Sequence, residues 1–278
     1  VYPSILVNVG TTKNTGIELS LTADAVVNRP VTWTTGINYA YGTTKLTKLS
    51  NDIYQASYLD LYQKPGAGTS EYFFRVEEGG RIGQFYGYEY AGVDENHNML
   101  VYNADGEKVI AATADPKDKR YIGDGAPRHF LTWNNTIRWK NFDLSLMFNG
   151  AFKFQIFNMR RYGMGLQGSG SDNVLRSAYL KDRDVWSGGG VISSYFLERG
   201  DYFKLENVTL GYTVPLKNRK LLDTIRVYLS AKNLFTITGY SGTDPSAVTS
   251  TGITPGIDVS SAYPSATQLT IGVTLKFR

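Results

Sequence analysis

Few side chains in this sequence are spaced for chemistry, and the clearest such spacing is that of a calcium loop. Oxygen-bearing residues stand at its first, third, fifth and twelfth positions, as Asp94, Asn96, Asn98 and Asp105. Carboxylate and amide oxygens suit Ca²⁺, but Met99 stands where the loop needs Gly, and Asp105 is shorter than the usual bidentate Glu. The stretch is a calcium candidate, with a loop of Asn and Asp turns as the alternative. No other cofactor is expected.

The sequence has few residues of the types that usually carry out catalysis or bind metals. The chain has two histidines and no cysteine, so thiolate metal sites and disulfides are excluded. His129 and Asp124 could be imagined as a dyad, but no nucleophile is placed beside them, and we expect no enzyme. Gly163, Gly165 and Gly168 have the spacing of a dinucleotide loop without the surrounding βαβ unit, which favours a flexible loop.

Aromatic and arginine side chains gather in two stretches between the regular segments. Exposed rings stack on sugars or peptide side chains, and arginines bind carboxylates, so these residues could line the mouth of a solute path. Alternatively, they pack the loops onto one another or onto a partner. The candidates are Tyr86, Tyr88, Tyr90, Arg160, Arg161, Tyr162, Arg176 and Tyr179.

The elements that carry these loops alternate with a period of two. At the end of the chain Leu269, Ile271, Val273, Leu275 and Phe277 alternate with polar or small residues. About seven segments share this pattern, which predicts half-buried antiparallel strands. They are 17–25, 31–41, 131–139, 142–149, 207–214, 225–236 and 268–278. Charged residues are only 19%, yet no apolar run is long enough for a spanning helix.

Aromatic placement and connection lengths favour a membrane barrel over a soluble β-sandwich, which remains the alternative. Rings lie near both ends of the predicted strands, as in the two girdles of outer-membrane barrels. One set is Trp33, Trp139, Phe142, Tyr212 and Phe277, and the other is Tyr39, Tyr41, Phe148, Phe152 and Phe235. Short turns near Pro30, Lys140 and Arg219 alternate with long excursions over 46–127, 153–201 and 238–265. We therefore expect the long loops outside the cell and Arg278 in the periplasm.

Seven strands cannot close a bacterial barrel, and an open edge in lipid leaves unpaired backbone groups. We expect partner strands from an N-terminal remainder of the same protein, because the chain starts within an alternating stretch at Ile5, Val7 and Val9. The surrounding partner is outer-membrane lipid. The net charge of +4, without a basic run, gives no reason to expect nucleic acid.

Several motifs also resemble a known family. "VNVGTTKNTGIELSL", "RIGQFYGYEYAGV", "IGDGAPRHFLTWNNTIRWKNFDLSLMFNGAF", "ERGDYFKLENVTLGYTVP", "IRVYLSAKNLFTITGYSGTDP" and "TPGIDVSSAYPSATQLTIGVTLKF" are similar to the C-terminal barrel region of SusC/RagA-family TonB-dependent outer-membrane transporters. The resemblance implies that residues 1–278 are part of one 22-stranded barrel domain, whose plug is not in this chain. It also implies TonB, which acts through that plug, and a SusD-like surface lipoprotein lid as partners.

The function implied is active import of oligosaccharides or oligopeptides, with an outer-membrane surface enzyme or adhesin on the same barrel as the alternative. Leu275 and Phe277 resemble the C-terminal signal for barrel assembly. Family chains usually end on the aromatic residue, whereas here Arg278 follows Phe277.

Overall fold

The structure is a computed structural model that describes residues 10–50, 55–65, 71–168, 173–187, 190–216, 221–247, 252–259, 263 and 265–278. The alternating stretch at Ile5, Val7 and Val9 and the turn at Arg219 lie outside the described residues. Among the described residues, no helix is both long and apolar enough to cross a membrane.

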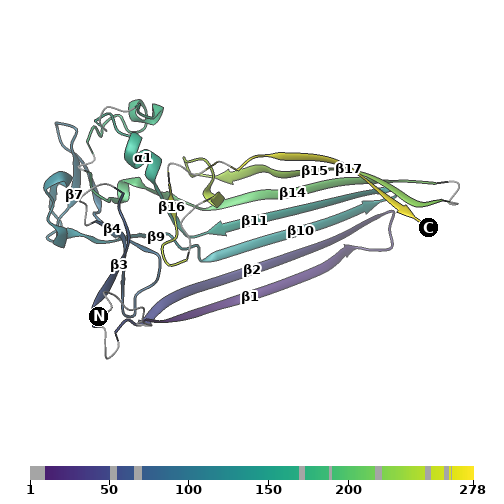
Figure 1. The fold of residues 1–278 in the computed structure, drawn as a ribbon, viewed down its shortest axis with the longest axis horizontal. Coiled ribbons are helices and arrows are strands. Elements are labelled where there is room, and N and C mark those ends of the chain that lie inside the picture. The colour runs from purple at the N-terminus through teal and green to yellow at the C-terminus, as the bar shows by residue number, and fades with distance from the viewer. Residues whose placement is uncertain are drawn as a thin grey trace, which may run out of the picture.

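Seven long antiparallel strands form one sheet (Figure 1). In spatial order they are β1 (Thr11–Val26), β2 (Val31–Lys48), β10 (His129–Trp139), β11 (Phe142–Phe152), β14 (Tyr202–Val214), β15 (Leu222–Thr238) and β17 (Gln268–Phe277). Each of the seven predicted segments is one of these strands. Both the fold class and the expected number of strands are therefore confirmed.

The register places the alternating apolar residues that define each of the seven predicted segments on one face. Leu144 pairs with Leu210, Leu210 with Leu229, and Leu229 with Ile271, so one apolar row crosses four strands. Leu229 is 50% exposed and Ile271 is 79% exposed, so this face is not covered by protein. The hydrophobic clusters found among the described residues lie at the end of the sheet where the long connections fold, and none lies on this row. A soluble sandwich would bury this face, whereas a barrel wall presents it to lipid.

Thr35 and Asn135 are polar residues within the apolar face. The indole nitrogen of Trp33 donates to Asn135 Oδ1 at 3.0 Å, and that of Trp133 donates to the Thr35 hydroxyl at 2.9 Å. Alternation alone does not predict polar residues here. Each gives a tryptophan N–H a partner within the wall, which matters because hydrocarbon offers none.

The opposite face carries polar pairs between strands. Ser20 donates to Asn38 and Thr34 donates to Asp24, each at 2.7 Å. Farther along the sheet, the Asp143–Arg226 ion pair crosses from β11 to β15 over Gly211 of β14. A Cβ at Gly211 would collide with both charged groups, so the glycine makes room for the pair. These contacts suit a wall that faces an aqueous lumen.

The long connections fold into a lobe at one end of the sheet, and the C-terminus lies at the other end with the short turns (Figure 1). Within its described residues, the lobe contains three small sheets. Their strands are β3 (Tyr58–Gln63), β4 (Tyr72–Glu77), β5 (Gln84–Gly87) and β9 (Arg120–Asp124); β6 (Tyr90–Val93), β7 (Met99–Tyr102) and β8 (Lys108–Ile110); and β12 (Gln155–Asn158), β13 (Leu197–Arg199) and β16 (Ile257–Asp258). Its helix is α1 (Met159–Met164), and its 3-10 turns are η1 (Ala111–Thr113), η2 (Pro116–Asp118), η3 (Arg176–Tyr179), η4 (Ser194–Phe196) and η5 (Pro245–Ala247).

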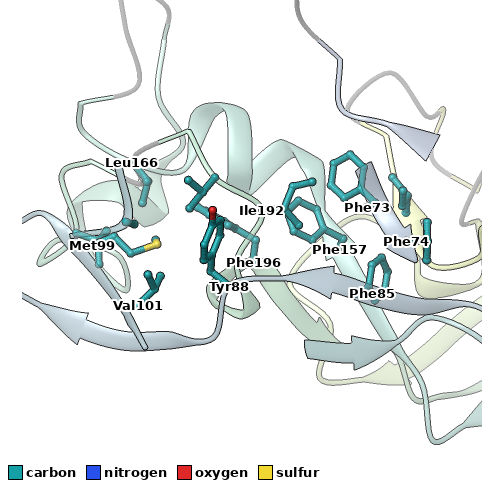
Figure 2. Packing of buried hydrophobic residues seen from close by; sticks show 14 residues of the cluster. Phe73, Phe74, Phe85, Tyr88, Met99, Val101, Phe157, Leu166, Ile192 and Phe196 are labelled. Atoms are coloured by element: carbon teal, nitrogen blue, oxygen red, sulfur yellow. The ribbon is translucent and has the colours of Figure 1, made fainter. Parts of the chain in front are cut away.

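The lobe has its own hydrophobic core (Figure 2). Phe73 and Phe85 from the first long connection meet Phe157 and Phe196 from the second, and all four are fully buried. Phe73 and Phe157 pack edge to face with ring centroids 4.9 Å apart. The connections are therefore ordered by burial of aromatic side chains rather than by the sheet alone.

Candidate functional site

The lobe and the polar face of the sheet enclose two adjoining cavities, which together form the candidate mouth. The larger has a volume of about 390 Å³, and its lining includes Phe130, Phe154, Tyr202, Pro245 and Pro255. The smaller has about 210 Å³ and shares Phe130 with the first. Phe130 belongs to the lumen-facing set of β10, because it pairs with Ala40 of β2 and Ala151 of β11. The mouth therefore opens on the lumen side of the wall.

Two guanidinium groups meet one carboxylate in the smaller cavity. Arg128 Nη2 lies 2.8 Å and Arg81 Nη2 lies 3.2 Å from Asp124 Oδ2. Burial raises the pKa of Asp124, although the Ala126 N–H and Arg81 oppose that rise. Within the described part of the chain, Arg128 Nε is buried without a hydrogen-bond partner. The trio carries a net charge of +1 when Asp124 is ionised, which suits an anionic group of a solute.

The segment between β9 and β10 positions this trio. Ala126 N donates to Asp124 Oδ1 at 3.1 Å, and Gly125 N donates to the Gly83 carbonyl at 2.8 Å. A Cβ at Gly125 would meet the Pro255 carbonyl oxygen, so the third long connection can approach only a glycine here. Sequence reasoning missed the two arginines, because no fixed spacing relates residues so far apart. The motif "IGDGAPRHF", which contains Asp124 and Arg128, was the one sequence feature that pointed to this segment.

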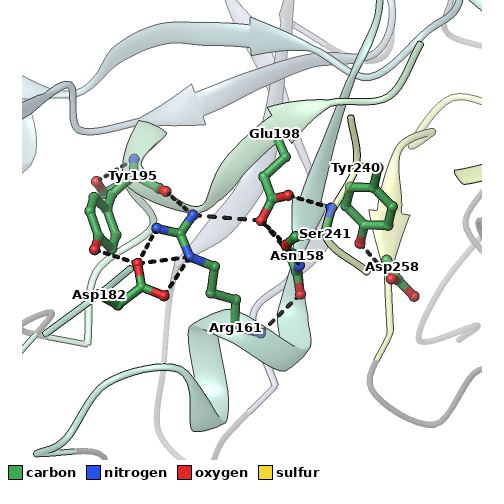
Figure 3. A network of polar contacts seen from close by, with 9 residues as sticks. Asn158, Arg161, Asp182, Tyr195, Glu198, Tyr240, Ser241 and Asp258 are labelled. Atoms are coloured by element: carbon green, nitrogen blue, oxygen red, sulfur yellow. Dashed lines mark hydrogen bonds and ion pairs between the residues drawn. The ribbon is translucent and has the colours of Figure 1, made fainter. Parts of the chain in front are cut away.

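A buried clamp holds the second long connection (Figure 3). Arg161 Nη2 lies 2.5 Å from Asp182 Oδ1, and the Tyr195 hydroxyl donates to the same oxygen at 2.6 Å. Arg161 also donates to the Tyr195 carbonyl at 2.7 Å and lies 3.6 Å from Glu198. Burial would raise the pKa of Asp182, but hydrogen bonds from Arg161 and Tyr195 outweigh that effect and hold the pKa below its usual range. Arg161 is therefore committed to structure.

The three tyrosines of the first long connection occupy different environments. Tyr86 takes part in a stack in which the Arg75 guanidinium lies 4.3 Å from its ring centroid. Tyr88 is 3% exposed in the lobe core, and burial raises its pKa to about 12. Tyr90 packs on Tyr195 with centroids 4.7 Å apart. Tyr88 therefore fits the alternative in which these residues pack the loops onto one another. A solute or lid contact by Tyr86 or Tyr90 stays a prediction.

The candidate residues of the second long connection also differ in their environments. Arg160 donates to the Thr243 hydroxyl at 3.3 Å, and Tyr162 donates to the Gly190 carbonyl at 2.8 Å. Arg176 and Tyr179 lie on η3 with exposed side chains, Tyr179 being 62% exposed. Tyr90 and Arg161 both contact Tyr195, so the structure links the two stretches there. Arg176 and Tyr179 are the candidates most open to a partner.

The imagined dyad does not form. His129 lies on the lipid-facing side of β10, where its Nδ1 is 2.7 Å from the Tyr39 hydroxyl. Asp124 instead holds Arg81 and Arg128 on the other face. The second histidine, His97, stacks on Trp186 with centroids 4.2 Å apart.

The calcium candidate forms an Asx turn. Asp94 Oδ1 accepts the backbone N–H groups of Asn96 and Asn98, and Asp94 Oδ2 accepts the Asn98 amide. These hydrogen bonds, that to the Asn98 side chain first, lower the pKa of Asp94. Asp105 donates its N–H to Asn103 in a separate turn. No cluster of three His, Cys, Asp or Glu suited to a metal occurs among the described residues. Calcium binding stays a prediction.

The glycine motif of the second connection spans the end of α1. Gly163 lies within that helix and Gly165 caps it, with its N–H donating to the Arg161 carbonyl at 2.8 Å. Leu275 and Phe277 lie on the lipid-facing side of β17, an edge strand of the seven-stranded sheet, and are 48% and 62% exposed. Their part in barrel assembly stays a prediction.

Known proteins resemble this chain over nearly its whole length. TonB-dependent receptor P3 of Formosa agariphila is 29% identical over 97% of the chain, and TonB-dependent receptor SusC of Bacteroides thetaiotaomicron is 26% identical over 97%. The solved structure of the RagAB peptide transporter superposes with a TM-score of 0.75, at 27% identity over 96% of the chain. Over nearly its whole length the chain therefore resembles TonB-dependent receptors of the SusC/RagA family. No family model matches the sequence.

These matches cover only part of each relative. The chain spans 29% of the length of receptor P3, 27% of SusC and 30% of the RagAB chain. SusC/RagA receptors are proteins of the outer membrane, which agrees with the exposed apolar face of the sheet. The relatives are named receptors and a transporter, which agrees with the expectation of a protein that is not an enzyme.

Proposed function

We propose that this chain forms seven strands of the wall, and part of the outer mouth, of a TonB-dependent importer of oligosaccharides or oligopeptides. The observation that carries the proposal is the two-faced sheet, apolar and exposed on one side and polar on the other. The long connections lie outside the cell and Phe277 lies at the periplasmic end. A SusD-like lipoprotein covers the mouth, and TonB acts through a plug contributed by the remainder of the receptor, which also supplies the missing strands.

Of the two solute classes, the geometry of the mouth favours oligopeptides. Phe130, Phe154 and Tyr202 offer apolar and aromatic contacts, and Arg81 and Arg128 offer charge for a carboxylate. A neutral oligosaccharide can stack on the rings but gains nothing from the excess positive charge. The peptide is held between mouth and lid, then released inward when TonB remodels the plug.

Uptake by the full receptor in cells tests this assignment. Loss of a charge-assisted hydrogen bond costs about 1.5–3 kcal/mol, so Arg81→Gln with Arg128→Gln should weaken binding of a short peptide with a free carboxyl terminus at least about tenfold. The same peptide with an amidated terminus should change much less. The control is Lys117→Gln, which removes an exposed charge of the lobe outside the mouth. Uptake of neutral glycans alone, unaffected by both arginine substitutions, would instead select oligosaccharides.

The alternative of a surface enzyme or adhesin on this barrel makes different predictions. An importer accumulates solute inside the cell only with TonB present and co-purifies with a surface lipoprotein. An enzyme would release a cleaved product without TonB, and an adhesin would retain its ligand outside. The position of His129 gives the enzyme alternative no catalytic pair.

A further inference from the structure

A further cavity adjoins the mouth at Tyr202 and extends onto the lipid-facing side of the wall. It has a volume of about 590 Å³ and lies where the second long connection leans over β11, β14 and β15. Phe152, Phe203 and Ile237 line it from the apolar face of the sheet, and Tyr202 and Thr238 line it at the strand ends. Phe203 pairs with Ile237, and both belong to the apolar face that also carries Leu205 and Phe235. Flanking strands on both sides belong to this chain, so the floor of the cavity is complete.

Cations edge the same cavity, and the two carboxylates in its lining, Glu198 and Asp201, lie near Arg161 and Arg199. Lys181 and Arg199 line it with exposed side chains, and the exposed Lys153 directly follows Phe152. Arg199 pairs with Asp201 at 2.7 Å but is 80% exposed, and no ion pair of Lys181 occurs within the described ranges. Positive groups therefore stand at the rim of an apolar surface, as a lipid with a negatively charged headgroup requires.

The buried clamp fixes these cations in place. Lys181 adjoins Asp182 in the chain, and Arg199 adjoins Glu198. Arg161 holds Asp182 at 2.5 Å and Glu198 at 3.6 Å, so one buried guanidinium sets the positions of both segments. The backbone of both segments is therefore held by buried residues, while the exposed side chains of Lys181 and Arg199 can reach an anion at the rim.

We propose that this cavity binds a phosphorylated, multiply acylated lipid of the outer leaflet. Its phosphate lies between Lys181 and Arg199, with Lys153 nearby, and its acyl chains lie along Phe152, Phe203 and Ile237. A lipid satisfies both parts of the site, whereas a soluble anion would leave the apolar floor in contact with water. The inference rests on the proposed function in one respect, namely that the long connections lie outside the cell.

Native mass spectrometry of the full receptor in detergent, titrated with diphosphorylated lipid A, tests the site. Because each basic side chain near a charged lipid surface contributes about 1 kcal/mol, the double variant K181E/R199E should bind at least about tenfold more weakly. The control K108E/K117E reverses two exposed charges elsewhere on the lobe and should bind like the unmodified receptor. Phosphate-free lipid A should bind both receptors equally weakly.

Three outcomes would overturn the proposal: equal affinities of K181E/R199E and its control, equal binding of phosphorylated and phosphate-free lipid, or displacement of the lipid by millimolar inorganic phosphate. Labelling of Lys181→Cys on intact cells with a membrane-impermeant maleimide separates this failure from failure of the proposed function. Labelling without lipid selectivity removes the lipid site alone. Protection of Cys on intact cells, with labelling only after the outer membrane is opened, removes the orientation and the lipid site together.

Discussion

Replacing Leu229 by arginine tests the two-faced wall most directly. Leu229 is on the apolar face of β15, roughly 23 Å from Leu222 and roughly 20 Å from Phe235 at about 3.3 Å per residue, so it lies near the middle of the lipid-exposed band. Arginine on the lipid face at mid-membrane costs about 2–4 kcal/mol. The neighbouring Ser230 points to the lumen, where arginine stays hydrated. Its hydroxyl lies 2.9 Å from that of Thr209, and losing this contact costs about 1 kcal/mol.

The expected difference between Leu229→Arg and Ser230→Arg is therefore about 2 kcal/mol, or roughly 30-fold in the folding equilibrium constant. The assay is refolding of the full receptor into lipid vesicles over a denaturant series, with the folded fraction read from heat-modifiable electrophoretic migration. Leu229→Arg should fold only at clearly lower denaturant than Ser230→Arg. Equal loss for both, or a greater loss for Ser230→Arg, would refute the assignment of lipid and lumen faces.

Three further predictions concern the lobe and the lumen face. The lowered pKa of Asp182 stabilises the folded lobe above the unfolded value of about 3.9, and this contribution is lost as pH falls through the folded pKa. Asp182→Asn should cost about 3–5 kcal/mol by removing the nearer of the two carboxylates beside the buried Arg161, and should reduce the acid dependence of lobe melting. Gly211→Ala should displace the ion pair above it and lower stability by at most about 1 kcal/mol in denaturant titration, since that pair is partly exposed. Chelation should leave the melting temperature unchanged if backbone and amide donors keep the Asp94 carboxylate occupied, whereas a calcium-dependent rise would establish the site.

The alternation of residues predicted the seven-stranded sheet, because the alternation within each strand shows by itself which side chains share a face. Side chains alternate at every residue, so Leu269 and Ile271 indicate one face without knowledge of any neighbour. Thr35 and Asn135 escaped this rule, since their partners are tryptophans on adjacent strands. Pairing across the sheet was needed to explain them.

The lobe was beyond sequence reasoning, because its contacts join residues far apart in the chain. Arg161 was a candidate solute or lid contact by residue type, with packing between loops as the alternative, and in the fold it binds Asp182 and Tyr195. Arg81 and Arg128 meet only because Asp124 lies between them in space. Neither periodicity nor spacing encodes such encounters, and residue type alone does not separate a buried arginine from one that awaits a ligand.

The shared core of the lobe also constrains the order in which the molecule can mature. Phe73 and Phe85 precede β10, Phe157 and Phe196 precede β14, and Ile257 precedes β17, yet all five are fully buried together. The lobe core can therefore be completed only after the last of the three connections is in place. Contacts this distant along the chain form slowly, so the earlier connections lack part of their core until then.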